Sequence, residues 1–171
     1  GGVGSFSVAI LAQNVATTVA ATGKADQHAF LKALGAAEVI GRDEVDPDSS
    51  KPMLAGRWAA VVDTVGGPIL AGALKSVKPR GVVTCCGLVA APELVTTVFP
   101  FILRGIRLIG VDCAECPIEI RRDLWMMLAG EWKIEHLETL YTEIGLDELD
   151  GRIDRMLEGG SRGRALVNID A

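Results

Sequence analysis

The chain has 171 residues and a net charge of −5 at pH 7, and 49% of its residues are hydrophobic while only 5% are aromatic. A chain of this length can bury a core without disulfides or metal, and an aliphatic core is typical of parallel sheets that are covered on both faces. Because the charges are interspersed and no apolar run reaches 18 residues, we expect neither a nucleic acid nor a membrane as a partner.

The apolar pattern predicts helices and strands that alternate along the chain. In chain order we expect a helix over residues 5–15, a strand over 17–21, a helix capped by Asp26 and closed by Gly35, a strand over 39–40, a polar surface loop over 43–57, a strand over 58–63, a helix from Pro68 to Val77, a strand over 81–86, a short helix over 98–103, a strand over 106–111, helices over 118–128 and 147–157, and a strand over 165–169. This alternation predicts βαβ units, a parallel sheet and an α/β fold of the Rossmann, doubly wound type.

The chain opens on a glycine-rich segment, Gly1-Gly2-Val3-Gly4, directly before the first predicted helix. Glycine lets the backbone approach a pyrophosphate closely, and the first N–H groups and the dipole of the following helix favour an anion. A glycine cluster alone is equally compatible with a plain turn, but the βαβ pattern downstream favours the phosphate interpretation. No strand precedes this segment, so we expect the sheet to lack its first, central strand and the intact protein to supply residues upstream of Gly1.

The predicted strand over residues 17–21 is followed by Thr22-Gly23-Lys24. An NAD site places an acidic residue at this position, where it binds the ribose 2′-hydroxyl. Here no acid would repel a 2′-phosphate, a hydroxyl and an ammonium group can bind one, and Arg42 adds a cation after the next strand. The sequence therefore predicts NADPH as the cofactor, the alternative being that Lys24 and Arg42 are solvated surface charges.

Several motifs occur in the order found in a known superfamily. The segments Gly1-Gly-Val-Gly-Ser5, Leu34-Gly-Ala36, Asp63-Thr-Val-Gly66 and Cys86-Gly-Leu88 resemble the medium-chain dehydrogenase/reductase superfamily. More narrowly, Phe99-Pro-Phe-Ile-Leu-Arg104, Arg107-Leu-Ile-Gly-Val-Asp112 and Gly163-Arg-Ala-Leu-Val167 resemble the acrylyl-CoA reductase branch of the quinone oxidoreductase-like enzymes. The resemblance extends over nearly the whole chain.

This resemblance implies an activity and a domain organisation. Members of the branch are zinc-independent, NADPH-dependent enzymes that reduce a carbon–carbon double bond conjugated to a carbonyl, typically in acryloyl-CoA, and we expect an acyl-CoA or a small enone or quinone as substrate. Residues 1–145 would form the NADP-binding domain, truncated at its start. Residues 146–171 would form a helix and a strand that return toward a catalytic domain outside this chain, so the chain alone is expected to be inactive.

The resemblance also implies which residues bind the cofactor, whereas the catalytic residues stay unidentified. Gly1, Gly2 and Val3 would contact the pyrophosphate. The 2′-phosphate would meet Thr22, Gly23, Lys24 and Arg42, the nicotinamide would lie near Leu88, Ala90 and Cys113, and Arg164 would reach the cofactor from the final strand.

Other residues with chemical potential have simpler interpretations. Cys113 and Cys116 have the spacing of half a zinc knuckle, but the other two cysteines are adjacent, Cys85-Cys86, in a predicted buried strand, so we expect no metal. Without an export signal, the cysteines are expected to be reduced and the protein cytoplasmic. Asp63 is expected to accept hydrogen bonds from the turn that follows it rather than to take part in catalysis.

Two alternatives to a reductase stay open, and one assembly is expected. A methyltransferase is disfavoured because Thr22-Gly23-Lys24 lacks the acid that such enzymes usually place there. A non-catalytic NADPH-binding module or sensor is not excluded, since a fold does not determine a function. The apolar strand over residues 106–111 is predicted at the sheet edge, and exposed apolar edges are usually covered, so we expect a homodimer.

Overall fold

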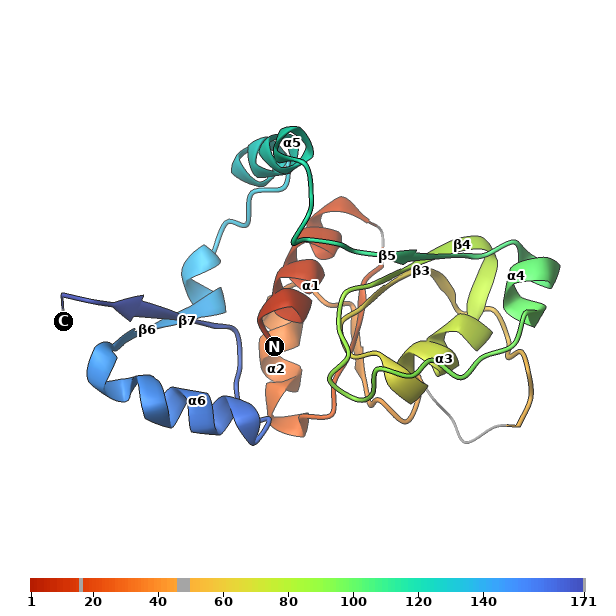
Figure 1. The fold of residues 1–171 in the computed structure, drawn as a ribbon, viewed down its shortest axis with the longest axis horizontal. Helices are drawn as coiled ribbons and strands as arrows, with labels where there is room; N and C mark the ends of the chain where they lie inside the picture. Colours follow the sequence, from red (N-terminus) through yellow and green to blue (C-terminus); the bar gives the residue numbers. More distant parts are fainter. Residues whose placement is uncertain (16, 46–49, 171) are drawn as a thin grey trace.

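The computed structural model describes residues 1–15, 17–45 and 50–170 as an α/β fold (Figure 1). The elements are α1 (Gly2–Asn14), β1 (Val19–Ala21), the 3-10 helix η1 (Ala25–Gln27), α2 (His28–Ala33), β2 (Glu38–Ile40), β3 (Trp58–Asp63), α3 (Gly67–Lys75), β4 (Val77–Cys85), α4 (Phe99–Arg104), β5 (Arg107–Gly110), α5 (Ile118–Ala129), η2 (Leu137–Leu140), β6 (Tyr141–Gly145), η3 (Leu146–Glu148), α6 (Leu149–Leu157) and β7 (Arg164–Asn168). No described helix combines the length and the apolar character needed to cross a bilayer.

The strands form separate parallel sheets. One contains β1 and β2, a second has the order β3-β4-β5, and a third contains β6 and β7. In a Rossmann sheet the first strand lies between the second and the fourth. The separation of β1-β2 from β3-β4-β5 matches such a sheet without its first strand, which confirms the predicted fold class.

The free edge of β3 shows the effect of this separation on burial. Ala59, Ala60 and Val62 are exposed, although strands of a parallel sheet are normally buried on both faces. Val62 keeps 41% of its surface exposed. Among the described strands, β3 pairs only with β4, so its other edge is free.

The hydrophobic core nevertheless connects the β1-β2 sheet with the β3-β4-β5 sheet. The largest cluster lies between α3 and the sheet, where Leu74, Val77 and Val83 have no exposed surface. A second cluster is centred on Ile40, Val45 and Ala73, and Val19 of β1 and Val61 of β3 both pack against it. Side-chain packing therefore holds β1-β2 beside β3-β4-β5 even though no backbone pairing between them is described.

Two local predictions near the first helices are wrong in detail. Helix α1 begins at Gly2 rather than at Ser5, so the glycines form its first turn. Asp26 does not cap α2, because the N-cap residue is Gln27 and the Asp26 carboxylate accepts a hydrogen bond from the Gln27 side chain at 2.5 Å. Gly35 does close α2 as predicted, with a φ of +96° and its N–H bonded to Lys32.

Strand β4 is longer than predicted. It begins at Val77, where the sequence predicts the end of a helix, and Val77 pairs with Trp58 before the register shifts. Arg80 has a φ of +63° within this strand. Pro79 and Gly81 interrupt the apolar pattern in the sequence and therefore resemble a turn, although the chain passes through an irregular strand.

The C-terminal part contains a strand that the sequence analysis missed. β6 lies at the end of a polar stretch and pairs with β7 along its whole length, from Tyr141–Arg164 to Gly145–Asn168. Most residues of β6 are polar or exposed, but Ile144 is buried, as is Leu140 at the end of η2 directly before the strand. Helix α5 stands apart from the sheets (Figure 1) and has no buried residue, so Trp125, which is 66% exposed, is not part of a core.

Candidate functional site

The N-terminus of α1 is open to an anion. The first intrahelical hydrogen bond runs from the Ser5 N–H to Gly1 at 3.0 Å, so the N–H groups of the three residues before Ser5 precede the helical ladder. No side chain caps this end and no acid lies in the first turn. The helix dipole and these N–H groups therefore present partial positive charge without a competing carboxylate.

Basic side chains from three other segments gather around the same point. The charges of Lys24, Arg42 and Arg164 all act on the nitrogen atom of Gly1, the residue directly before α1. Lys24 follows β1, Arg42 follows β2 and Arg164 begins β7. The structure thus brings together the cations that the sequence singled out, at the predicted phosphate-binding helix.

Gly2 leaves space for the guanidinium of Arg164. A Cβ atom on Gly2 would lie 2.5 Å from Arg164 Nε and 2.6 Å from its Cζ, so any larger side chain would displace the guanidinium. Gly4 differs, because the nearest atom to its Cβ position is Thr64 Oγ1 at 3.9 Å. At Gly23 the nearest atoms belong to Arg42, at 3.7 Å, which is ordinary contact and places Arg42 over the Gly23 turn.

Thr22 and Lys24 form a compact turn at the end of β1. The Lys24 N–H donates to Thr22 Oγ1 at 3.1 Å, so the hydroxyl fixes the backbone that carries the lysine. The Lys24 ammonium donates to the carbonyl oxygen of Ser161 at 2.6 Å. Sequence reasoning missed Ser161, because nothing in the pattern of the chain connects it with a residue 137 positions away.

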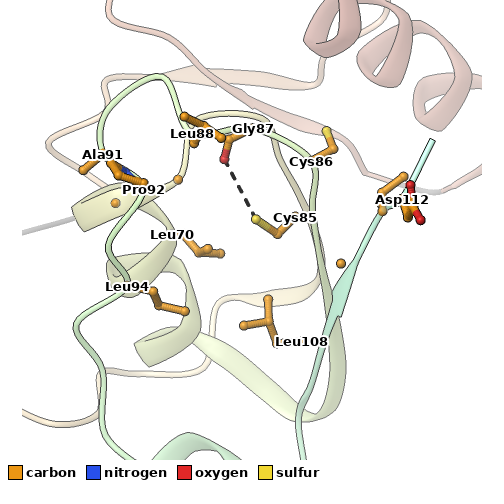
Figure 2. Close-up of a pocket in the computed structure, with 14 residues that line it drawn as sticks. Leu70, Cys85, Cys86, Gly87, Leu88, Ala91, Pro92, Leu94, Leu108 and Asp112 are labelled. Carbon is orange, nitrogen blue, oxygen red and sulfur yellow. Dashed lines mark hydrogen bonds between the residues drawn. The ribbon is translucent and has the colours of Figure 1, made fainter. Parts of the chain in front are cut away.

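An open cavity of about 610 Å³ lies at the carboxyl ends of β4 and β5 (Figure 2). Leu70, Leu94 and Leu108 form its apolar wall, and the side chains of Cys86 and Asp112 lie at its rim. Leu88 lines this cavity as well. Ala90 and Cys113 lie beside it in sequence, next to the lining residues Ala91 and Asp112.

The turn after β3 supports one side of the cavity. Asp63 is 5% exposed and its carboxylate accepts a hydrogen bond from the Gly66 N–H at 2.9 Å, which confirms the predicted role of this acid. Gly66 has a φ of +73°, and its Cβ position is 2.8 Å from Gly87 O, so a side chain there would clash with backbone. The Ala90 N–H donates to Val65 O at 2.9 Å, so the loop that carries Leu88 and Ala90 is fixed to this turn.

The four cysteines are free thiols with different surroundings. Cys86 is exposed, which corrects the prediction that it lies inside a buried strand, because β4 ends one residue earlier. Desolvation raises the pKa of the Cys86 thiol, and Asp63, Cys85 and Cys113 raise that pKa further. Within the described parts of the chain, no group of three or more His, Cys, Asp or Glu side chains is arranged to hold a metal ion.

Comparison with known proteins places these features in a family. The family model described as zinc-binding dehydrogenase matches residues 2–129. The acrylyl-CoA reductase AcuI of Ruegeria pomeroyi is 35% identical over 171 residues, which are 100% of this chain and 52% of that protein. The chain thus spans about half the length of this relative.

Two solved structures resemble the fold closely. The Bacillus subtilis protein yhfP, crystallised with NAD bound, is 36% identical with a TM-score of 0.94. The yhdH oxidoreductase of Salmonella enterica, crystallised in complex with NADP, is 37% identical with a TM-score of 0.93. Each likeness covers 99% of this chain and 52% of the solved chain.

The surroundings of Cys86 predict slow alkylation of its thiol at neutral pH, because only the thiolate is nucleophilic. Replacing Asp63→Asn removes a negative charge and keeps an acceptor for Gly66, so the pKa of Cys86 should fall and its alkylation by iodoacetamide at pH 7.5 should accelerate about two- to threefold. Peptide mass spectrometry resolves the rate at Cys86. The control Asp123→Asn, on exposed α5, should leave the rate unchanged, and an unchanged rate in Asp63→Asn would contradict the assigned electrostatic cause.

Proposed function

Because the chain belongs to the zinc-binding dehydrogenase family of the medium-chain dehydrogenase/reductase superfamily, we propose that it supplies the cofactor-binding part of an NADPH-dependent reductase. The proposed substrate contains a carbon–carbon double bond conjugated to a carbonyl, as in an acryloyl-CoA-type thioester, an enone or a quinone. The observation that carries the proposal is the convergence of Lys24, Arg42 and Arg164, without an acid in the first turn, at the N-terminus of α1.

The proposed pyrophosphate site is the first turn of α1. The N–H groups there are available to phosphate oxygens, and Gly2 allows the guanidinium of Arg164 to lie directly over the backbone. Gly1, Gly2 and Val3 would therefore contact the pyrophosphate, with Arg164 compensating its charge.

The proposed 2′-phosphate site is the turn after β1. Thr22 offers a hydroxyl group, and Gly23 leaves its backbone accessible. Lys24 and Arg42 supply positive charge, which suits a 2′-phosphate, whereas the uncharged 2′-hydroxyl of NADH would not require it. This arrangement supports NADPH over NADH. The crystallised relative from Salmonella contains NADP, although the one from Bacillus subtilis contains NAD.

The nicotinamide end would lie toward the cavity beside Leu88, Ala90 and Cys113. When bound, NADPH supplies the hydride for reduction of the double bond. The residues of this chain would hold it and shield it from water with an apolar wall, and the described residues include no evident donor for an enolate oxygen. We also propose that the reaction is zinc-independent, on the resemblance to the acrylyl-CoA reductase branch.

The name of the Ruegeria relative supports an acyl-CoA substrate for the complete protein. Four free thiols support a reducing compartment, and we assign the enzyme to the cytoplasm on that ground. NADPH-dependent turnover of acryloyl-CoA by the full-length protein tests the reductase against a non-catalytic NADPH-binding module. Tight NADPH binding without turnover of any conjugated thioester, enone or quinone would favour the module.

We predict that Lys24→Ala and Arg42→Ala in the full-length protein each weaken NADPH binding about 10- to 100-fold, because each removes a charged hydrogen bond worth about 1.5–3 kcal/mol. The affinity for NADH should change little, and titration of cofactor fluorescence measures both. Matched controls are Lys133→Ala and Arg122→Ala, which lie at exposed positions after and within α5. Equal loss for both cofactors would contradict a 2′-phosphate site.

A second prediction compares the effects of replacing Gly2 and Gly4, both in the first turn of α1. Gly2→Ala should weaken NADPH and NADH about equally, by roughly tenfold, since the new methyl group displaces Arg164 from the pyrophosphate site. Gly4→Ala should bind both normally, because its Cβ position is open. Thermal unfolding should show no loss of stability for either variant, since alanine favours a helix over glycine. Normal binding by Gly2→Ala would remove Arg164 from the proposed site.

A third prediction concerns assembly. β5 is the edge strand of its sheet, and Ile109 and Val111 remain 45% and 48% exposed there. We propose that a second copy covers this edge, so the full-length protein should be a dimer by light scattering. Ile109→Lys should dissociate the dimer while Leu157→Lys, at a 78% exposed position, should not. A monomeric wild-type protein would refute this assembly.

A further inference from the structure

The turn between α6 and β7, residues 159–163, lies against the start of α2 (Figure 1). The Ser161 carbonyl accepts a hydrogen bond from the Lys24 ammonium at 2.6 Å. The next residue, Arg162, places its guanidinium 4.6 Å from the ring centre of Phe30 in α2. These contacts hold a segment from the end of the chain against the turn proposed to bind the 2′-phosphate.

The shape of this turn is well determined by its own contacts. Gly159 and Gly163 have φ values of +75° and +59°, which favour glycine. The Gly160 N–H donates to Arg155 O at 2.8 Å, and the Arg152 side chain donates to Arg162 O at 2.9 Å. Ser161 is therefore presented to Lys24 by a defined backbone.

The side chain of Ser161 has an unmet hydrogen-bonding requirement. Its Oγ atom is buried and has no hydrogen-bond partner among the described residues. A buried hydroxyl without a partner costs about 1–3 kcal/mol, so such groups are normally paired with protein, water or ligand. The carbonyl of the same residue accepts a hydrogen bond from the Lys24 ammonium, so this hydroxyl belongs to a residue that contacts a proposed 2′-phosphate ligand.

We propose that Ser161 is a further determinant of cofactor selectivity, with its hydroxyl donating a hydrogen bond to the 2′-phosphate beside Lys24. The inference rests on the proposed function, because it needs a cofactor that carries this phosphate. Phosphate oxygens accept hydrogen bonds only, and a serine hydroxyl is a donor that can rotate to meet them. The buried Gln27 Oε1 in η1 also lacks a partner, but it is an acceptor and cannot take this role.

The Ser161 carbonyl has a complementary effect on Lys24. It occupies one of the three ammonium donors and leaves two for the phosphate. Because it holds the flexible lysine in one place, less side-chain entropy is lost when the phosphate binds. Ser161 would thus act on the same phosphate through two atoms, and replacement by alanine removes only the hydroxyl.

The test uses the full-length protein, with 2′,5′-ADP and 5′-AMP as probes that differ only in the 2′-phosphate, and calorimetry as the measurement. Ser161→Ala should weaken 2′,5′-ADP about 10- to 100-fold, since it removes one hydrogen bond to a charged group, and should leave 5′-AMP unchanged. Ser161→Thr keeps the hydroxyl and should retain most of the preference. The control Thr97→Ala, at an exposed position in the segment before α4, should match the wild type.

The possible failures are distinguishable. If the wild type prefers 2′,5′-ADP and Ser161→Ala keeps the full preference, the hydroxyl does not contact the phosphate and the inference alone is overturned. If Ser161→Ala weakens both probes equally, Ser161 only supports the turn, and the inference is again overturned. If the wild type binds both probes equally, the proposed preference for NADPH fails, and the role of Ser161 fails with it.

Discussion

The accumulation of positive charge at one helix terminus is the constraint on which the rest of the site depends. Lys24, Arg42 and Arg164 come from different segments, and their positive charges all act near the unpaired N–H groups at the start of α1. No carboxylate in the first turn of α1 offsets them. The cations and the helix dipole both attract negative charge, so the arrangement favours phosphate groups over neutral ones.

The parallel topology explains how distant residues reach this point. The carboxyl ends of parallel strands meet at one edge of a sheet, and the segments that follow β1 and β2 carry Lys24 and Arg42 there. β7 contributes Arg164 from its first residue instead, because it belongs to a separate sheet that is oriented by its pairing with β6. The candidate site therefore needs the sheet of β1 and β2 and also the C-terminal unit of β6, α6 and β7.

The sequence predicted those parts of the molecule in which local pattern and tertiary structure agree. The apolar run of β3, the proline at the start of α3 and the glycine after α2 each have one simple local meaning, and each was confirmed. β4 and β6 differed, because Pro79 and Gly81 resemble a turn and β6 is mostly polar. The contact between Lys24 and Ser161 was unpredictable for another reason, since it depends on how two separate units pack.

This packing connects the C-terminal unit, which consists of β6, α6 and β7, with the proposed cofactor site. Three contacts attach it to the N-terminal elements: the Lys24–Ser161 hydrogen bond after β1, the Arg162–Phe30 contact on α2 and the close approach of Arg164 to Gly2 in α1. Two of these three contacts involve residues proposed to bind the cofactor phosphates. By thermodynamic linkage, a ligand that strengthens these contacts also stabilises the docked position of β6, α6 and β7. Cofactor binding and the docking of the C-terminal unit would then stabilise each other, in keeping with proposed phosphate-binding residues on α1, after β1 and on β7.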